Sequence, residues 1–77
     1  MNAATTRTAK ARAAVFAACL QHPRYLAMTA LKERLGARWN LADAYREPKA
    51  AQLAKRFDRV CRALGTFEDR ALRAAGL

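Results

Sequence analysis

The stretch PKAAQLAKRFDRVCRALG, residues 48–65, holds the densest group of side chains that could bind a charged partner. Wound as an α-helix at about 100° per residue, it places five cations within an arc of roughly 140°: Lys49, Lys55, Arg56, Arg59 and Arg62. The only acid in the stretch, Asp58, lies outside this arc. Solvated helix faces usually alternate acids with cations at spacings of three and four residues, because such pairs stabilise the helix. Their separation here predicts a face for an anionic partner such as a phosphate backbone.

Other polar side chains extend this predicted binding set. Arg46 comes just before the helix, and Gln52 lies among its cations. Cations at these positions would contact phosphates, whereas Gln52 or an arginine could reach the edge of a base. Arg7 and Lys10 form a second, smaller basic spot on the predicted first helix.

The overall charge agrees with a polyanionic partner. Fifteen Lys and Arg oppose six Asp and Glu, giving a net charge of +9 and an isoelectric point near 10.9. A field of this strength on a small surface attracts polyanions, so nucleic acid, DNA or RNA, is the first expected partner and an acidic protein surface is the alternative. An Arg- and Ala-rich proteome would produce a similar total without selection for binding, so the prediction depends on the arrangement of the cations.

The usual arrangements of residues for catalysis or metal binding are missing from the sequence; Cys19 or Cys61 could pair with His22, but nothing in the sequence brings a general base to a thiol. There is no Ser, and the single His22 stands beside Pro23 in a predicted turn. Only the acids Glu68 and Asp69 are adjacent, in what would be the first turn of a helix, where negative charge stabilises the helix dipole. The glycines are isolated and form no phosphate-binding loop. We therefore expect no enzyme, no cofactor and no metal site.

The elements that must position these side chains are helices, because Ala, Leu, Arg and Lys dominate the chain and Ile is absent. We expect an all-α fold, a compact bundle of about five short helices that could be a trihelical core with a helix added at each end. Thr5 or Thr6 would cap the first helix, Gly36 and Gly65 would end helices, and Asn40 and Thr66 would start new ones. The expected ranges are residues 6–21, 24–35, 41–47, 48–65 and 67–75, in one domain spanning 1–77 with residues 1–5 flexible.

Apolar residues at helical spacing give the expected core. Trp39 should close the base of the bundle from a turn, Cys19 and Cys61 should pack as small apolar residues, and Leu26, Leu72 and Leu77 lie off the stripes. A helix-turn-helix centred on Gly36 fits poorly, because Lys32 takes a position for a small buried residue and Pro48 shortens the second helix. The expected inward-facing residues are Val15, Phe16, Cys19, Leu20, Met28, Leu31, Leu35, Leu41, Ala44, Tyr45, Leu53, Phe57, Val60 and Leu64.

Three functions from different classes remain open. The first is a small DNA- or RNA-binding protein, such as a phage- or plasmid-type regulator of transcription. The second is a small inhibitor or adaptor that docks its basic face on an acidic protein or on a nucleic-acid-binding partner. The third, binding to a membrane surface, is disfavoured because the core needs the apolar stripe of residues 53–64. Oligomeric state stays open at this point.

The expected compartment is the cytoplasm. Two cysteines are too few for a disulfide framework, and no apolar run reaches the ~18 residues that span a membrane. Arg7, Lys10 and Arg12 before AAVFAACL resemble a targeting segment only faintly, because the apolar run is mostly Ala.

Overall fold

The computed structural model describes the backbone of residues 3–77 and the side chains of residues 7–77. Within this part the chain forms three helices and no strand: α1 (Ala3–Cys19), α2 (Pro23–Ala44) and α3 (Ala50–Ala74). The all-α prediction is confirmed, whereas the prediction of about five helices is wrong. Two pairs of expected helices are each fused into one.

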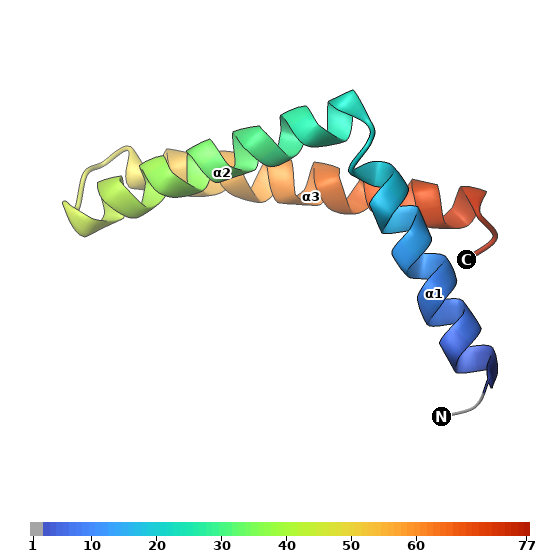
Figure 1. The fold of residues 1–77 in the computed structure, drawn as a ribbon. Coiled ribbons are helices and arrows are strands. Elements are labelled where there is room, and N and C mark those ends of the chain that lie inside the picture. The colour runs from blue at the N-terminus through green and yellow to red at the C-terminus, as the bar shows by residue number, and fades with distance from the viewer. Residues whose placement is uncertain (1–2) are drawn as a thin grey trace.

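The helices are arranged as an open layer (Figure 1). α2 and α3 lie side by side as an antiparallel hairpin, and α1 contacts the C-terminal part of α3 before its N-terminal half projects away. The molecule measures 51 × 29 × 15 Å, and its radius of gyration is 16.3 Å. A globular domain of this length has a radius of gyration of about 11.5 Å. The expected compact bundle is therefore replaced by an elongated hairpin with one helix docked at its end.

Gly36 does not end a helix. It lies within α2, at a point where the Phe57 ring packs closely against the helix. A Cβ atom at Gly36 would lie 3.1 Å from Cε2 of Phe57, so the missing side chain leaves room for this ring. The Phe57 ring also packs against Trp39, with ring centroids 5.5 Å apart. Trp39 thus lies within α2 and packs against the core, and a helix-turn-helix centred on Gly36 is excluded.

The second expected boundary, at Gly65 and Thr66, also lies inside a helix. The Thr66 hydroxyl donates a hydrogen bond to the carbonyl oxygen of Arg62 at 3.0 Å, so it is satisfied within α3 and caps no new helix. Asn40 likewise lies within α2.

The ends of α2 follow local rules. His22 caps its N-terminus by accepting a hydrogen bond from the backbone N–H of Arg24, and Pro23 occupies the first turn. At the other end the N–H groups of Arg46 and Glu47 donate to the carbonyls of Asp43 and Ala42, which is a Schellman motif. Its left-handed position is occupied by Arg46, with φ of 54°. The same motif ends α3 at Gly76, with φ of 79°.

The core is small. Its central cluster is Leu35, Ala42 and Leu53, and the half-buried Leu31, Trp39, Ala50, Phe57 and Val60 pack against it. Cys19, Leu64 and Leu72 are also buried, and Cys61 is half-buried. The prediction that Leu72 lies off the packed surface is therefore wrong.

The expected inward direction of Leu41, Ala44 and Tyr45 is wrong. All three are exposed, whereas Ala42 is fully buried. Because α2 continues through Gly36, Ala42 follows Leu35 by two helical turns and takes the inward position. Leu20 is also exposed, since it lies beyond the last residue of α1.

The N-terminal helix begins earlier than expected. α1 starts at Ala3, so the proposed caps Thr5 and Thr6 lie inside it, as do residues 3–5 of the segment expected to be flexible. Residues 1 and 2 of that segment lie outside the described residues. No helix in the described part is long and apolar enough to cross a membrane.

Candidate polyanion-binding face

Seven cations of the hairpin form two rows, one along each helix, whereas the helix cations Lys32, Lys55, Arg62 and Arg73 lie outside the rows. On α2, Arg24, Arg34 and Arg38 fall within an arc of about 80° at helical spacing. On α3 a second arc of about 80° holds Lys49, Arg56, Arg59 and Arg70. The acids of both helices fall outside these arcs: Glu33, Asp43, Asp58, Glu68 and Asp69.

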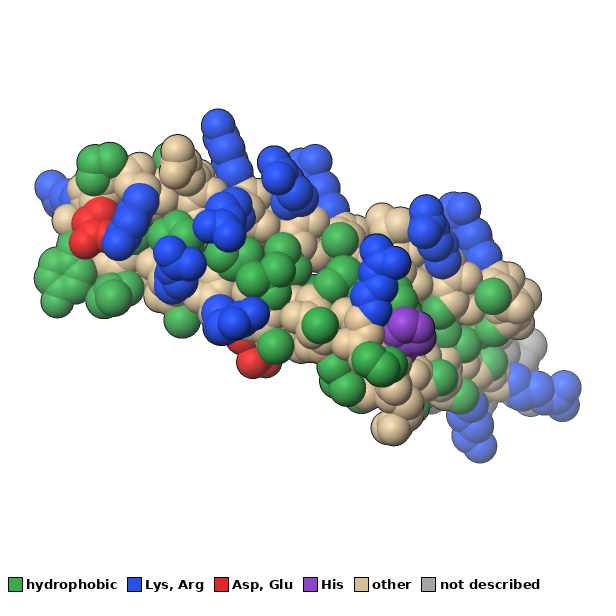
Figure 2. All heavy atoms as spheres, turned by 90° about the horizontal axis from the view of Figure 1, so that it is seen from above, with side chains coloured by type: hydrophobic (Ala, Val, Ile, Leu, Met, Phe, Trp, Pro, Cys, Tyr) green, Lys and Arg blue, Asp and Glu red, His purple; other side chains and the backbone are tan. Residues whose placement is uncertain are grey.

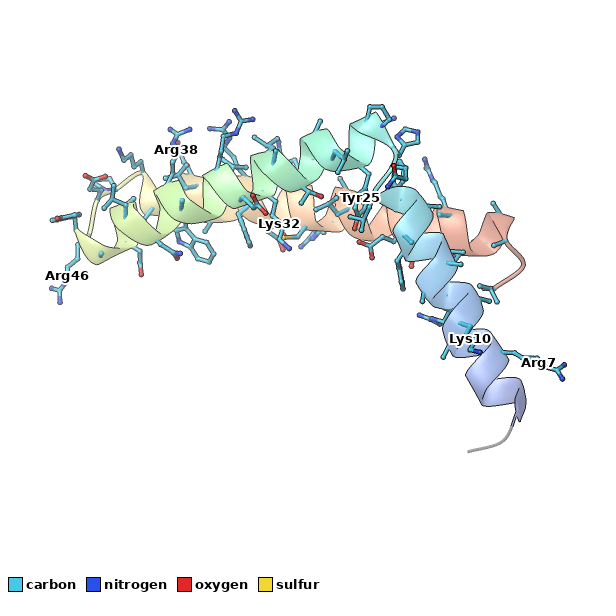
Figure 3. The ribbon with its side chains drawn as sticks, viewed as in Figure 1. Arg7, Lys10, Tyr25, Lys32, Arg38 and Arg46 are labelled. Atoms are coloured by element: carbon cyan, nitrogen blue, oxygen red, sulfur yellow. The ribbon has the colours of Figure 1, made fainter. Side chains whose placement is uncertain are left out.

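The two rows lie on the same side of the hairpin. Arg24 and Arg70 line one cavity from the two helices, whereas Tyr25 and Glu68 meet at the opposite edge. Figure 3 shows Arg38 on the upper side of α2 and Lys32 on its lower side. Seen from above, Lys and Arg side chains extend along both edges of the hairpin around an apolar strip, and few acids are visible (Figure 2).

We call this surface the basic face and define it by the two rows together. All its cations are exposed, so their charges are solvated and accessible to a partner. Two helix axes packed side by side are about 8–10 Å apart, and the α3 row extends for about 31 Å at 1.5 Å per residue. The shape is a narrow strip that suits a linear polyanion. Its members are Arg24, Arg34, Arg38, Lys49, Arg56, Arg59 and Arg70.

The structure divides the residues predicted from the sequence. Lys49, Gln52, Arg56 and Arg59 lie on the basic face or at its margin. Lys55 and Arg62 point from the outer edge of α3, directly away from α2.

Two of the predicted cations have acidic neighbours. Arg62 forms an ion pair with Asp58 at 2.9 Å, and Lys49 pairs with Glu47 at 3.2 Å. The interpretation that these cations lack acidic partners is therefore wrong at these two positions. Both pairs are largely exposed and contribute little to stability.

Arg46 lies at the tip of the hairpin (Figure 3), where it lines a cavity with Asp43 and Glu47. Arg7 and Lys10 are exposed on α1, far from that tip. They are therefore separate from the basic face.

Sequence reasoning missed the contribution of α2. With Gly36 as a helix end, the sequence predicts that Arg38 lies in a turn. Its position on the same side of a helix as Arg34 is then not apparent. The signal was present as the 10- and 4-residue steps from Arg24 to Arg34 and Arg38, which return to one side of a continuous helix. Arg70 was missed for the same reason, since Gly65 was taken as the end of α3.

The basic face is hollowed at its wide end. A cavity of about 460 Å³ lies between Arg24 and Arg70, and Met28 and Phe67 contribute to its apolar lining. The Phe67 ring is fixed between two others, with centroids 5.0 Å from His22 and 5.4 Å from Tyr25. This cavity combines an apolar wall with two guanidinium groups.

Tyr25, at the opposite edge of the hairpin, has a raised pKa. The hydrogen bond that Tyr25 donates to Glu68 raises the pKa of Tyr25, and burial adds to the effect. The described residues include no group of three or more His, Cys, Asp or Glu side chains that could hold a metal ion.

Comparison with protein-family models, with curated proteins and with solved structures finds no match to this chain.

Proposed function

We propose that this protein binds nucleic acid through the basic face. The observation that supports the proposal is the separation of charge across the hairpin: seven cations of α2 and α3 gather on one side, and the acids of both helices lie outside it. Such a strip would neutralise phosphates and release their counterions, which favours binding without regard to sequence. A regulator of the phage or plasmid type is one role that such a protein could serve.

The binding mode follows from the two rows. Arginine forms paired hydrogen bonds with phosphate oxygens, so Arg38 on α2 and Arg59 on α3 would grip the backbone from both sides of the strip. Gln52 lies beside the α3 row and would be the residue available to a base edge. Lys55 and Arg62 would contribute only through the general field.

The test compares two double variants that remove the same charge. Arg38→Ala with Arg59→Ala removes one cation from each row, whereas Lys55→Ala with Arg62→Ala removes two cations from the outer edge. Affinity for duplex DNA, single strands and structured RNA is measured by fluorescence anisotropy from low to high salt. Each lost phosphate contact lowers the slope of log affinity against log salt by about 0.7–0.9.

We expect the first variant to weaken binding strongly and to reduce that slope by roughly 1.4–1.8. The second should stay close to the unmodified protein. Equal losses in the two variants would show that net charge alone drives binding and would contradict a defined face. No binding to any nucleic acid at low salt would refute the function itself.

A second candidate function is an adaptor that docks on an acidic protein. The cavity between Arg24 and Arg70 favours it, because phosphates make no favourable contact with the apolar wall of Met28 and Phe67. A carboxylate-bearing amphipathic segment would use both features. Pull-down after nuclease treatment separates the two functions: a single stoichiometric protein partner, with no affinity for nucleic acid, supports the adaptor.

A further inference from the structure

The tip of the hairpin exposes two large apolar side chains. Leu41 is 62% exposed and Tyr45 is 73% exposed, the highest values among the large apolar residues of the described part. Nothing in the fold requires them there, since Ala42 supplies the core contact of this turn. Leu41 and Tyr45 are four residues apart, so their side chains lie one helical turn from each other and form one apolar patch that a partner can cover.

These two residues continue the α2 row of cations. Arg34, Arg38, Leu41 and Tyr45 follow one another at steps of four, three and four residues and fall within an arc of about 60°. The backbone N–H of Tyr45 still donates to the carbonyl of Leu41 at 3.2 Å, so Tyr45 is one full turn beyond Leu41. A single ligand lying along this row would meet two guanidinium groups and then an apolar end.

The backbone beside Tyr45 is strained. Arg46 holds φ of 54°, a left-handed conformation that glycine adopts without cost and that other residues adopt at a cost. Strain of this kind concentrates at functional positions. The residue that bears it adds a further positive charge at the tip of the hairpin (Figure 3).

We propose that the tip binds an unpaired base of a nucleic acid, an inference that rests on the proposed function and specifies its substrate class. The base would stack on the Tyr45 ring and pack against Leu41. The phosphates of the same strand would contact Arg34 and Arg38. Charge and apolar surface alternate along a single strand in this way, whereas a duplex keeps its bases out of reach. The substrate is therefore single-stranded DNA or RNA, or a duplex with an unpaired segment.

The experiment measures anisotropy of a labelled single strand and of the duplex made from it. The proteins are the unmodified chain, Tyr45→Ala, Tyr45→Phe and Leu26→Ala, the last being another exposed apolar residue of α2 outside the row. Circular dichroism verifies that each variant is folded. Stacking on an aromatic ring accounts for roughly 5- to 150-fold in affinity per base when the ring is removed.

We expect Tyr45→Ala to weaken binding of the single strand by at least about fivefold, with no change in the salt slope, because no phosphate contact is lost. Duplex affinity should change less than about twofold, and Tyr45→Phe should keep the affinity for the single strand because the ring is retained. Leu26→Ala should resemble the unmodified protein.

The two proposals fail in different ways. If the unmodified protein binds nucleic acid but Tyr45→Ala weakens single strand and duplex equally, or weakens neither, the tip does not stack on a base and only this inference is overturned. If the unmodified protein binds no nucleic acid, and Tyr45→Ala instead weakens its binding to an acidic protein partner, both proposals are overturned.

Discussion

Tyr25 and Glu68 are joined by a hydrogen bond although 43 positions separate them in the chain. The Tyr25 hydroxyl donates to Oε1 of Glu68 at 2.9 Å, which ties the start of α2 to the last third of α3. This contact lies at the edge of the hairpin opposite the basic face. It makes part of the stability of the fold depend on the protonation of a phenol.

Tyr25→Phe should reduce the free energy of unfolding at neutral pH. It should also make that free energy fall less steeply as the pH rises above 10. The bond raises the pKa of Tyr25 above its ordinary value of 10.0, so the folded state holds this proton more tightly than the unfolded state. The stabilisation is therefore fully present below about pH 10 and is lost as the pH rises through the folded pKa.

Urea unfolding of both proteins from pH 8 to pH 11 measures this effect. At pH 8 we expect the variant to be less stable by about 1 kcal/mol, the usual net value of a hydrogen bond. The difference should shrink above pH 10, because the unmodified protein loses the Tyr25 proton and with it the hydrogen bond, whereas the variant has no phenol to deprotonate. A constant difference across the range would show that the phenol proton is not linked to folding.

Gly65→Ala should stabilise the protein. Gly65 lies inside α3, and a Cβ atom there would have no neighbour within 4 Å. Replacing Gly by Ala in a helix interior contributes about 1 kcal/mol, which corresponds to a rise of about 4–8 °C in Tm for a domain of this size.

Gly36→Ala is the matched control for this prediction. It gains the same helix propensity but places a Cβ atom 3.1 Å from the Phe57 ring. We expect a smaller rise in Tm than for Gly65→Ala, or a fall. Equal rises in thermal unfolding would mean that the Phe57 ring yields freely and that Gly36 has no packing role.

Arg46→Gly should increase stability and weaken binding at the same time. Glycine removes the strain of a left-handed residue, which is about 1–2 kcal/mol. It also increases the conformational entropy of the unfolded chain, and this offsets part of the gain. Chemical unfolding should show a net gain below about 1 kcal/mol, while affinity for a polyanion falls because the charge is lost. Arg46→Lys separates the effects, since it keeps both charge and strain. A loss of stability in Arg46→Gly would show that the arginine makes stabilising contacts.

Cys19 and Cys61 should react with a thiol reagent at different rates. Cys19 is buried at the end of α1, whereas Cys61 is half-buried. In the single-cysteine variant Cys61→Ala, the Cys19 thiol becomes accessible only when α1 leaves α3, so its rate reports local undocking. We expect Cys19 to react more slowly than the Cys61 of the variant Cys19→Ala. A faster reaction at Cys19 would show that α1 is not docked in solution.

The sequence predicts the helical class and the inward stripe of α3, because both depend on propensity and periodicity within one element. Leu53 and Leu64 are buried as expected, and Phe57 and Val60 pack against the core. The helix boundaries failed at the glycines. Gly36 is retained within a helix because of Phe57, a residue distant in sequence, and local rules for glycine cannot include such a contact.

The same failure limited the prediction of the candidate site. The phase of Arg38, Leu41 and Tyr45 is defined only when α2 is read as one continuous helix. If Gly36 and Asn40 are helix boundaries, the predicted orientation of Leu41 and Tyr45 is inward and Arg38 is predicted to lie in a turn. The α3 half of the basic face was visible because Lys49, Arg56 and Arg59 precede the false boundary at Gly65.

The basic face and the acids of α2 and α3 lie toward different sides of the hairpin. Such a molecule has a transverse electric dipole in addition to its net charge. If the protein binds nucleic acid as proposed, the field of the phosphate backbone would exert a torque on this dipole and would turn the protein toward a productive orientation before contact. Steering of this kind raises association rates above the usual 10⁵–10⁶ M⁻¹s⁻¹ and declines with ionic strength. The separation of charge would thus accelerate the search as well as strengthen the final complex.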